Sequence, residues 1–482
     1  MSMLYSKNCS TTDGGFMKVN LEQKKIPIYL KIYEELKNKI EKNEYPENSK
    51  LPSIRQLALK YKLNNITIMK AFTLLEKEGY IIKKRGVGIF VKSKEFLFYN
   101  TASNNLIETF KVGQLKDNNL INFASGTPSE DVYPFEIFKK LYNQVLEECG
   151  PKIMLYHPTQ GLDELRETIK QDIEEKGIFV SKDDIQITSG SQQGLDLILK
   201  TFSSKRKNKI IVGNPTYHGA LNTFKTNCKI YPVEIEEDGF NLTQLENILS
   251  EEKISFIYTT MDFSCPTGIS WSEEKKQRLI SLARKYNTLI VEDDFASELS
   301  FNNIPKTSIK SLDLDNKIVI YIKSFSKIIM PGLRLAYMIA PQELISKIVT
   351  VKFTTDITTS ALDQKVLAHF LKNGFLKSHV ANLFKIYSER YNALIEELKQ
   401  VPYIEVVYNI NGGFYIWIKL SEDIDSSKFY LKCKENNILL LSGNVFFLDN
   451  QKNQYFRLSF ATTDIPEIID GINRLKIIAK NI

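Results

Sequence analysis

The chain lacks the features of membrane proteins and of secreted proteins. No apolar run approaches the roughly 18 residues that a membrane-spanning helix needs. The first 15 residues lack a basic region followed by an apolar one, so they predict no secretory signal. The five cysteines include no CxxC pair, which argues against a disulfide framework or a zinc site, and the four histidines have no metal-ligand spacing. We therefore expect a cytoplasmic protein without a metal site.

Most of the chain also lacks an excess of basic over acidic residues. The 482 residues carry a formal net charge of +7, with 64 Lys and Arg against 57 Asp and Glu. Residues 1–95 contain 19 basic and 10 acidic residues, whereas the remainder contains 45 and 47. A phosphate backbone is the partner that such a basic segment predicts, although a merely solvated basic domain would have the same charge. The length predicts two or three domains.

Residues 25–92 have the pattern of a winged helix-turn-helix, and the polar residues 1–24 before them predict a mobile tail. Apolar residues recur every fourth position from Ile28 to Ile40, which predicts a helix. The run "SIRQLALKY" predicts a short helix capped by Ser53, and "ITIMKAFTLLEKEG" predicts a second one that ends at Gly79. The run "YIIKKRGVGIFVK" then predicts two strands around a glycine turn.

The chemistry of this segment suits a nucleic acid. The first turn of a recognition helix presents side chains to base edges or phosphates. Here that turn offers four polar side chains, Asn64, Asn65, Thr67 and Lys70. On the preceding helix, Arg55 can clamp a phosphate with its guanidinium fork, although a lone arginine is more often part of a surface ion pair. The predicted hairpin tip, which glycines allow to approach a groove closely, consists of Lys84, Arg85, Gly86 and Gly88.

The run 27–91 resembles the GntR family of winged-helix regulators. The motifs that carry the resemblance include "LPSIRQLALKY" and "ITIMKAFTLLEKEGYIIKKRGVGIFV". The resemblance implies that double-stranded DNA is contacted by Ser53, Arg55, Asn65, Thr67, Lys70, Arg85 and Gly86. Many relatives have arginine or serine where this chain has Asn64 and Asn65, so the base preference stays open.

The rest of the chain predicts a linker and a second, larger domain. The polar residues 93–119 predict a linker, and a flexible chain of that length has a reach of about 30 Å, enough to cross to a partner subunit. From residue 120 to 482, helices alternate with β-branched runs such as "KIIVGN" and "TLIVEDD". This alternation predicts an α/β domain with a largely parallel sheet and sites at the strand carboxyl ends. From about Ser378, a long helix and later strands predict a smaller α+β subdomain.

Six motifs of this larger domain supply the groups that pyridoxal phosphate needs. The cofactor needs a lysine for a Schiff base, a carboxylate at its pyridine nitrogen, a stacking ring and a grip on its phosphate. In chain order, the candidates are Ser191 and Gln192 in "TSGSQQG", Tyr217 in "NPTYHG", Asp293 in "IVEDD", Ser324 and Lys327 in "SFSK", Arg334 in "GLRLAY" and Arg457 in "YFRLSF". Singly these signals are weak, because each has an ordinary structural explanation. Arg457, for example, can instead form a structural ion pair.

Residues 120–482 resemble the class I, fold type I aminotransferases, and together with the GntR-like head they resemble the MocR subfamily of regulators. The resemblance implies pyridoxal 5'-phosphate as cofactor, with Lys327 as Schiff-base lysine, Asp293 at the pyridine nitrogen and Arg457 at a ligand carboxylate. It also implies that Tyr156, in "LYHPTQGLDELR", reaches the phosphate of the neighbouring subunit's cofactor. The expected protein is therefore a homodimer whose subunit joins a winged helix-turn-helix to an α/β fold type I aminotransferase-like domain with a small C-terminal α+β subdomain.

Two residues depart from the pattern of the family's enzymes. Phe295 stands where a tyrosine is common, and Cys265 precedes "PTG" where an asparagine is common. The resemblance implies that both missing groups would contact the cofactor's ring oxygen. A neutral hydrogen bond contributes only about 0.5–1.5 kcal/mol, so cofactor binding should survive while the tuning needed for turnover suffers. Alternatively, Ser264, Cys265 or a water replaces the lost donors.

Three functions fit these residues. The first is a transcription regulator that senses an amino compound through the Lys327 Schiff base. The second is a working aminotransferase that carries a DNA-binding head. The third is a regulator that senses the cofactor itself. The two departures favour sensing over fast turnover, and weak or half-transamination remains compatible with them.

Overall fold

The computed structural model describes residues 27–41, 44–46, 49–77, 80–84, 88–91, 113–114, 119–202, 207–301, 306–449 and 454–482. The chain divides into two compact units, residues 1–109 and 110–482. The predicted tail, 1–24, lies outside the described residues. So does the predicted linker, 93–119, apart from residues 113, 114 and 119.

The N-terminal unit has the elements of a winged helix-turn-helix. Its described elements are α1 (Ile28–Glu41), α2 (Ile54–Tyr61), α3 (Asn65–Lys77), β1 (Ile81–Lys84) and β2 (Gly88–Val91). The predicted four-residue spacing on α1 is the reason for its packing, because Ile32, Leu36 and Ile40 are all buried in one core with Phe72 of α3. Strands β1 and β2 pair antiparallel, with Lys84 opposite Gly88. The winged helix-turn-helix predicted from the sequence is confirmed.

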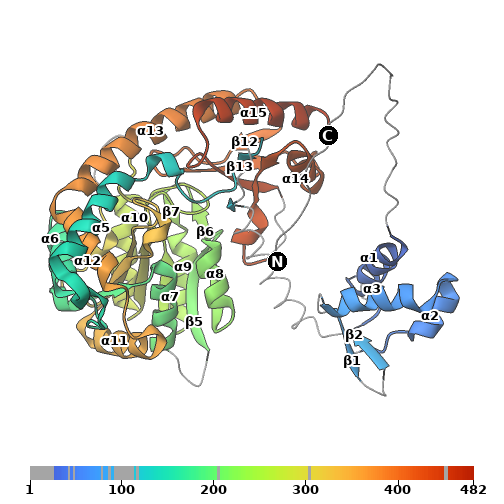
Figure 1. The fold of residues 1–482 in the computed structure, drawn as a ribbon, viewed down its shortest axis with the longest axis horizontal. Coiled ribbons are helices and arrows are strands. Elements are labelled where there is room, and N and C mark those ends of the chain that lie inside the picture. Colours follow the sequence, from blue (N-terminus) through green and yellow to red (C-terminus); the bar gives the residue numbers. More distant parts are fainter. Residues whose placement is uncertain are drawn as a thin grey trace, which may run out of the picture. The chain divides into compact units, whose positions relative to one another are not determined.

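The larger unit is built on an eight-stranded sheet (Figure 1). In spatial order, the strands are β4 (Ile185–Thr188), β11 (Ala336–Ile339), β10 (Val319–Ser324), β9 (Leu289–Asp294), β8 (Phe256–Thr259), β5 (Asn208–Asn214), β6 (Cys228–Glu236) and β7 (Gly239–Phe240). Neighbours from β10 to β6 are parallel, whereas β11 is antiparallel to both of its neighbours and β7 is antiparallel to β6. The largely parallel sheet is thus confirmed.

Helices cover both faces of this sheet, and alternation along β5 shows how. Ile210 and Val212 are buried against one helix layer, whereas Ile211 between them is buried against the other. The first layer consists of α7 (Ser191–Thr201), α8 (His218–Lys225) and α11 (Gln342–Asp356). The second consists of α9 (Leu242–Glu251) and α10 (Glu273–Lys285). A strand buried on both faces reads as a continuous apolar run, which is why "KIIVGN" shows no polar alternation.

The C-terminal part forms a smaller subdomain around an antiparallel sheet. Its strands, in spatial order, are β12 (Ile404–Val406), β13 (Tyr415–Leu420), β16 (Tyr455–Ser459) and β15 (Leu441–Ser442). Its helices are α13 (Phe375–Leu398), α14 (Ser426–Glu435) and α15 (Ile465–Lys480), and α13 and α15 pack side by side (Figure 1). One strand comes from the other end of the unit, because β3 (Ile121–Asn122) pairs in parallel with β14 (Ile438–Leu439).

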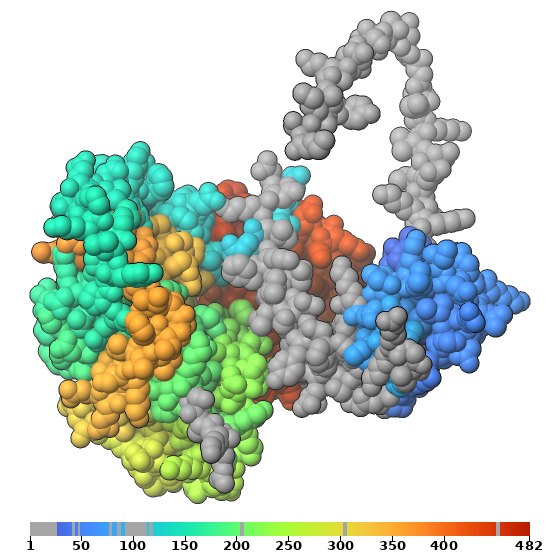
Figure 2. Space-filling view, turned by 60° about the horizontal axis from the view of Figure 1, so that its bottom comes forward, coloured from blue at the N-terminus to red at the C-terminus, as the bar shows by residue number. Residues whose placement is uncertain are grey.

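Three further helices of the larger unit pack together. They are α5 (Phe135–Cys149), α6 (Asp163–Glu174) and α12 (Ala361–Lys372). Helix α12 contacts both α5 and α6, and the three gather on one side of this unit as teal and orange surfaces (Figure 2). Of the three, α6 also contacts β4 at the edge of the eight-stranded sheet.

Candidate functional site

The strand register brings several predicted residues to one edge of the sheet. Asp293 near the end of β9 lies opposite Ile322 of β10, and β10 ends at Ser324, three residues before Lys327. Ser324 is in turn paired with Ala336 of β11, which pairs on its other side with Thr188, the last residue of β4. Because parallel strands end at the same edge, their following loops converge there, as in other open α/β sheets.

The side chain of Lys327 reaches across to the first segment of this unit. Its Nζ donates a hydrogen bond to the carbonyl oxygen of Gly126. Burial, together with the positive charge of Arg457, lowers the pKa of Lys327 to about 8. About half of an amine with such a pKa is neutral near pH 8. The neutral amine is the form that attacks a carbonyl carbon.

Asp293 has one satisfied oxygen and one unsatisfied oxygen. Its Oδ2 accepts a hydrogen bond of 2.8 Å from the hydroxyl of Tyr258 on β8, and both side chains are buried. Its Oδ1 is buried without a hydrogen-bond partner among the described residues. Burial raises the pKa of Asp293 to about 6, so the carboxylate is mostly ionised at pH 7. A buried carboxylate oxygen without a donor is a place for the N–H of a ligand.

The start of helix α7 lies against Arg334. Helix α7 begins at Ser191 after Gly190, whose φ is +96°. Arg334 Nη2 donates to the carbonyl oxygen of Ser189 at 2.9 Å, and a Cβ on Gly190 would lie only 2.6 Å from that nitrogen. Glycine is therefore required where the arginine crosses the backbone. The first amides of α7 and this guanidinium form a combination that suits a phosphate.

Gln192 and Ser324 are already engaged by protein groups. Gln192 Nε2 donates to the carbonyl oxygen of Gly219 at 3.2 Å and also hydrogen-bonds Thr223, both on α8. The Ser324 hydroxyl accepts from the amide of Ser326 at 3.2 Å. For Gln192, this leaves the backbone amide rather than the side chain as the group available to a phosphate.

Arg457 is buried on β16 and has no carboxylate partner among the described residues. Its Nη2 donates to the carbonyl oxygen of Ala124 at 2.7 Å, and its Nη1 lies 3.5 Å from Cys265 Sγ. Its guanidinium lies 4.2 Å from the ring centroid of Tyr415. The structural ion pair that the sequence left open is therefore not formed within the described residues.

The two departures lie in this same region. Cys265 is buried against Arg457, and the ring of Phe295 lies 6.2 Å from that of Tyr415. The hydroxyl of Ser264, one of the possible replacement donors, donates to the carbonyl oxygen of Thr260 at 2.7 Å.

The two predicted tyrosines have opposite environments. Tyr217 directly precedes α8, its ring lies 5.1 Å from that of His218, and burial raises its pKa. Tyr156 is 82% exposed and follows two exposed apolar residues, Met154 and Leu155. Such a side chain is free to contact another molecule.

In the N-terminal unit, helix capping uses two of the polar side chains expected near DNA. Ser53 and Gln56 form a capping box at the start of α2, which confirms the predicted cap. Asn64 Oδ1 accepts from both the amide and the hydroxyl of Thr67 at 2.8 Å, so the Asn64 side chain caps α3. Asn65, the first residue of α3, is exposed.

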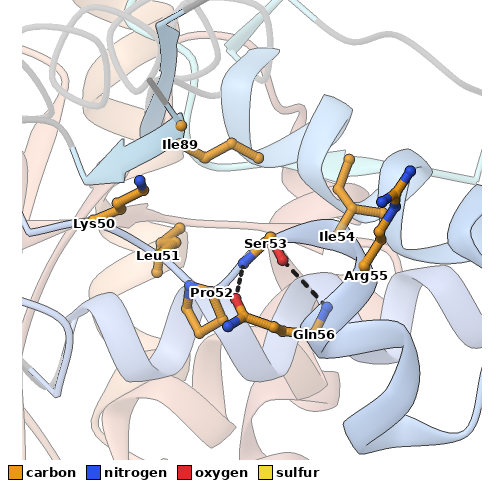
Figure 3. A pocket seen from close by; sticks show the side chains of 9 residues that line it. Lys50, Leu51, Pro52, Ser53, Ile54, Arg55, Gln56 and Ile89 are labelled. Atoms are coloured by element: carbon orange, nitrogen blue, oxygen red, sulfur yellow. Dashed lines mark hydrogen bonds between the residues drawn. The ribbon is translucent and has the colours of Figure 1, made fainter. Parts of the chain in front are cut away.

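The basic side chains of Arg55 and Lys70, which were predicted to contact DNA, are exposed. Lys70 lies 5.8 Å from the ring centroid of Tyr29. Arg55 has no carboxylate partner among the described residues and lines an open hollow with Lys50, on the other side of Ser53 (Figure 3). The predicted tip residues Arg85 and Gly86 lie outside the described residues.

Comparison with known proteins identifies both units. Residues 118–475 match the model of the family described as aminotransferase class I and II. The chain belongs to this aminotransferase family. Residues 28–91 match the model of the bacterial regulatory proteins of the gntR family. A gntR-family DNA-binding domain followed by an aminotransferase-like domain is the MocR architecture, which confirms the prediction from the sequence.

Individual relatives match either the whole chain or its aminotransferase part. The chain is 28% identical to the uncharacterized HTH-type transcriptional regulator YdfD of Bacillus subtilis, over 96% of this chain and 98% of that protein. It is 31% identical to aromatic-amino-acid aminotransferase 1 of Thermococcus litoralis, over 77% of this chain and 90% of that protein. The crystal structure of Pyrococcus horikoshii kynurenine aminotransferase with PMP is similar with a TM-score of 0.73, at 31% identity over 78% of this chain and 94% of that one.

The cofactor of this aminotransferase fold is pyridoxal phosphate, as predicted. The residues present fit it, because the unpartnered buried Oδ1 of Asp293 matches a pyridine N–H and Lys327 has the lowered pKa of a reactive amine. No helix in the described ranges is long and apolar enough to cross a membrane. Those same ranges contain no group of three or more His, Cys, Asp or Glu that could hold a metal ion.

The lowered pKa of Lys327 predicts how loading depends on pH. Only the neutral amine attacks the aldehyde, so the loading rate of cofactor-free protein should rise with pH around a midpoint of about 8. Replacing Arg457 with methionine removes a positive charge that favours the neutral amine, so the midpoint should move to higher pH. Stopped-flow absorbance after mixing with pyridoxal phosphate measures both rates. A lower midpoint in the variant would contradict this assignment.

Proposed function

We propose that this protein is a pyridoxal-phosphate-dependent transcription regulator whose aminotransferase-like domain senses an amino compound at Lys327. The observation that carries the proposal is a buried carboxylate oxygen of Asp293 without a hydrogen-bond partner among the described residues, near the end of the strand next to the one that leads to Lys327, in a chain that also carries a gntR-family domain. When bound, pyridoxal phosphate supplies an aldehyde for amines and an electron-withdrawing ring. The cofactor itself is a second candidate signal.

The proposed roles follow from the contacts of each residue. Lys327 holds the aldehyde carbon, Asp293 holds the pyridine N–H and Tyr217 lies against the ring. The phosphate is held by the amides of Ser191 and Gln192, by Arg334 and by Ser324. Arg457 binds the carboxylate of the ligand, since it is a buried cation with no carboxylate partner among the described residues.

The same site is proposed to be poor at turnover. Phe295 has no hydroxyl, and the Cys265 thiol has a raised pKa because it is buried, so it is at most a weak donor. With these two residues, the ring oxygen of the cofactor has fewer strong hydrogen-bond donors than it has in the family's enzymes, which commonly carry a tyrosine and an asparagine at these positions. We therefore expect weak transamination or half-transamination at most. Sustained keto-acid production at enzyme-like rates would instead support a working aminotransferase.

We further propose that the protein acts in the cytoplasm as a homodimer on paired DNA half-sites. Tyr156 of the partner subunit would reach the cofactor phosphate, which accounts for a tyrosine that is 82% exposed beside exposed Met154 and Leu155. The DNA contacts proposed for each head are those of Ser53, Arg55, Asn65, Thr67, Lys70, Arg85 and Gly86. A ligand can act on DNA binding only through different affinities for two conformations.

Footprinting on the protein's own upstream DNA tests this function. We expect protection of paired sites by the cofactor-loaded protein, and a change in that protection when an amino-compound panel contains the effector. Cofactor-free protein and protein reduced with borohydride are the controls, because neither can exchange Lys327 for a ligand amine. A pattern that stays the same with and without cofactor and with every amine would refute sensing.

A further inference from the structure

The exposed face of helix α3 carries large apolar side chains. Ile66 is 59% exposed and Met69 is 47% exposed, whereas Ile68 and Phe72 of the same helix are fully buried in the core. Residues three and four apart lie on the same side of a helix, so Ile66, Met69 and the exposed Thr73 form one stripe that faces away from the core. A large apolar side chain that is left exposed on a helix gains nothing from folding, so this stripe calls for a partner.

Several polar groups beside this stripe are already engaged within the helix. The cap at the start of α3 uses the side-chain oxygen of Asn64 as acceptor and the hydroxyl of Thr67 as donor. The hydroxyl of Thr73 donates to the carbonyl oxygen of Met69 at 2.9 Å, so the methyl group of this threonine remains for an outside contact. Asn65 is exposed, and its side chain has no hydrogen-bond partner among the described residues.

In the major groove of DNA, an apolar side chain has one specific partner. Thymine alone among the four bases presents a methyl group there, and apolar side chains recognise it by direct contact. An asparagine can bind adenine through N6 and N7 in the same groove. With Ile66 and Met69 beside the exposed Asn65, helix α3 therefore has a surface complementary to A·T base pairs.

The charge around the stripe favours DNA over an apolar protein partner. Lys70 on α3 and Arg55 on α2 are both exposed, and the first turn of α3 contains no acidic residue. Residues 1–95 contain 19 basic and 10 acidic residues, and residues 28–91 match the gntR family. A basic surround attracts phosphates on both sides of a groove, and it would add nothing to an apolar protein contact.

We propose that Ile66 and Met69 are specificity-determining residues that contact thymine methyl groups in the major groove, so that each half-site is read mainly at A·T pairs. This inference rests on the proposed function, which includes binding to paired DNA half-sites, and adds to it a class of base pair and two residues. Because both side chains are exposed, shortening them leaves the core of the N-terminal unit intact.

Deoxyuridine isolates the methyl group in an experiment. It pairs with adenine as thymidine does and lacks only the 5-methyl group. The protein's own upstream fragment is prepared once with thymidine and once with deoxyuridine, and fluorescence anisotropy gives the affinity of the cofactor-loaded full-length protein for each. The readout is the ratio of the two affinities. Arg55→Ala should weaken binding to both fragments and leave this ratio unchanged, because a phosphate contact does not involve the methyl group.

The wild-type protein should bind the thymidine fragment at least tenfold more tightly, because burying one methyl group changes an affinity roughly fourfold. Ile66→Ala and Met69→Ala should each lower the ratio roughly fourfold, and the double variant should bring it close to one. Leu59→Ala is the matched control. It shortens an apolar side chain that is 80% exposed on the neighbouring helix α2, and it should leave the ratio unchanged.

The outcomes separate this inference from the proposed function. A wild-type ratio near one would overturn thymine recognition while leaving DNA binding and sensing intact. A large ratio that both variants retain would overturn the assignment to Ile66 and Met69. So would variants that keep their DNA affinities and elute at a different size in gel filtration, because the stripe would then be a protein interface. A wild-type protein that binds neither fragment would instead overturn the proposed function itself.

Discussion

Replacing Lys327 with alanine is expected to abolish covalent attachment of pyridoxal phosphate. Of the lysines near the ends of β9 and β10, Lys327 is the one whose pKa falls to about 8, and its Nζ has a backbone carbonyl as its hydrogen-bond partner and no carboxylate partner among the described residues. Wild-type protein should become yellow with the cofactor and keep the colour through gel filtration. The variant should lose it, and its DNA protection should no longer respond to amines.

A neighbouring lysine provides the internal control. Lys323 is buried four residues earlier, and its Nζ is held between Asp294 at 2.9 Å and Glu298 at 2.5 Å. Borohydride reduction followed by peptide mapping should therefore place the cofactor on Lys327 and leave Lys323 unmodified. A label on Lys323, or a persistent label in Lys327→Ala, would contradict the assignment.

Replacing Arg55 with alanine should weaken DNA binding by roughly tenfold to a hundredfold. Arg55 is exposed on α2 and has no carboxylate partner among the described residues, so its guanidinium is available to a phosphate. Because a phosphate contact carries no sequence information, the weakening should be similar on all sites. The slope of log affinity against log salt should fall by about 0.9 for each phosphate that the variant no longer neutralises. Fluorescence anisotropy over a salt series measures both quantities.

Lys39 offers a matched control on the same domain. Its Nζ pairs with Glu35 at 2.6 Å on helix α1, so Lys39→Ala removes the same charge from a site that is already paired. It should change neither the affinity nor the salt slope appreciably. Equal weakening in the two variants would indicate that only the overall charge of the head matters, and would remove Arg55 from the interface.

The fold was predictable because its signals are local. The four-residue spacing on α1, the cap at Ser53 and the apolar runs of β5, β8, β9 and β10 each fix an element from a short window of sequence. Each predicted site motif follows an apolar run, so the sequence indicated that the site residues lie at strand ends. In the structure, Asp293 lies near the end of β9, Ser324 ends β10, and Lys327 follows three residues later.

Side-chain partners were less accessible to sequence reasoning, because they depend on tertiary contacts. Tyr258 lies in an apolar strand run, and only the placement of β8 beside β9 brings its hydroxyl to Asp293. Tyr415 and Gly126 are far apart in the chain and meet only in the folded unit. In the head, the first-turn position of Asn64 suggested base contact, whereas the unsatisfied amides at the start of a helix recruited its side chain as a cap.

The pairing of β3 with β14 has a consequence for biosynthesis. Ile121, near the beginning of the aminotransferase-like unit, finds its partner Ile438 only after nearly the whole chain has been made. The helices and strands that the structure describes in the N-terminal unit end at residue 91, so this unit can fold while the ribosome is still translating. During that interval, a DNA-binding domain is tethered to an unfinished sensor. A nascent or truncated chain that stops before residue 438 would therefore carry the DNA-binding part without a closed ligand-binding part, and control by a ligand begins only when synthesis is nearly complete.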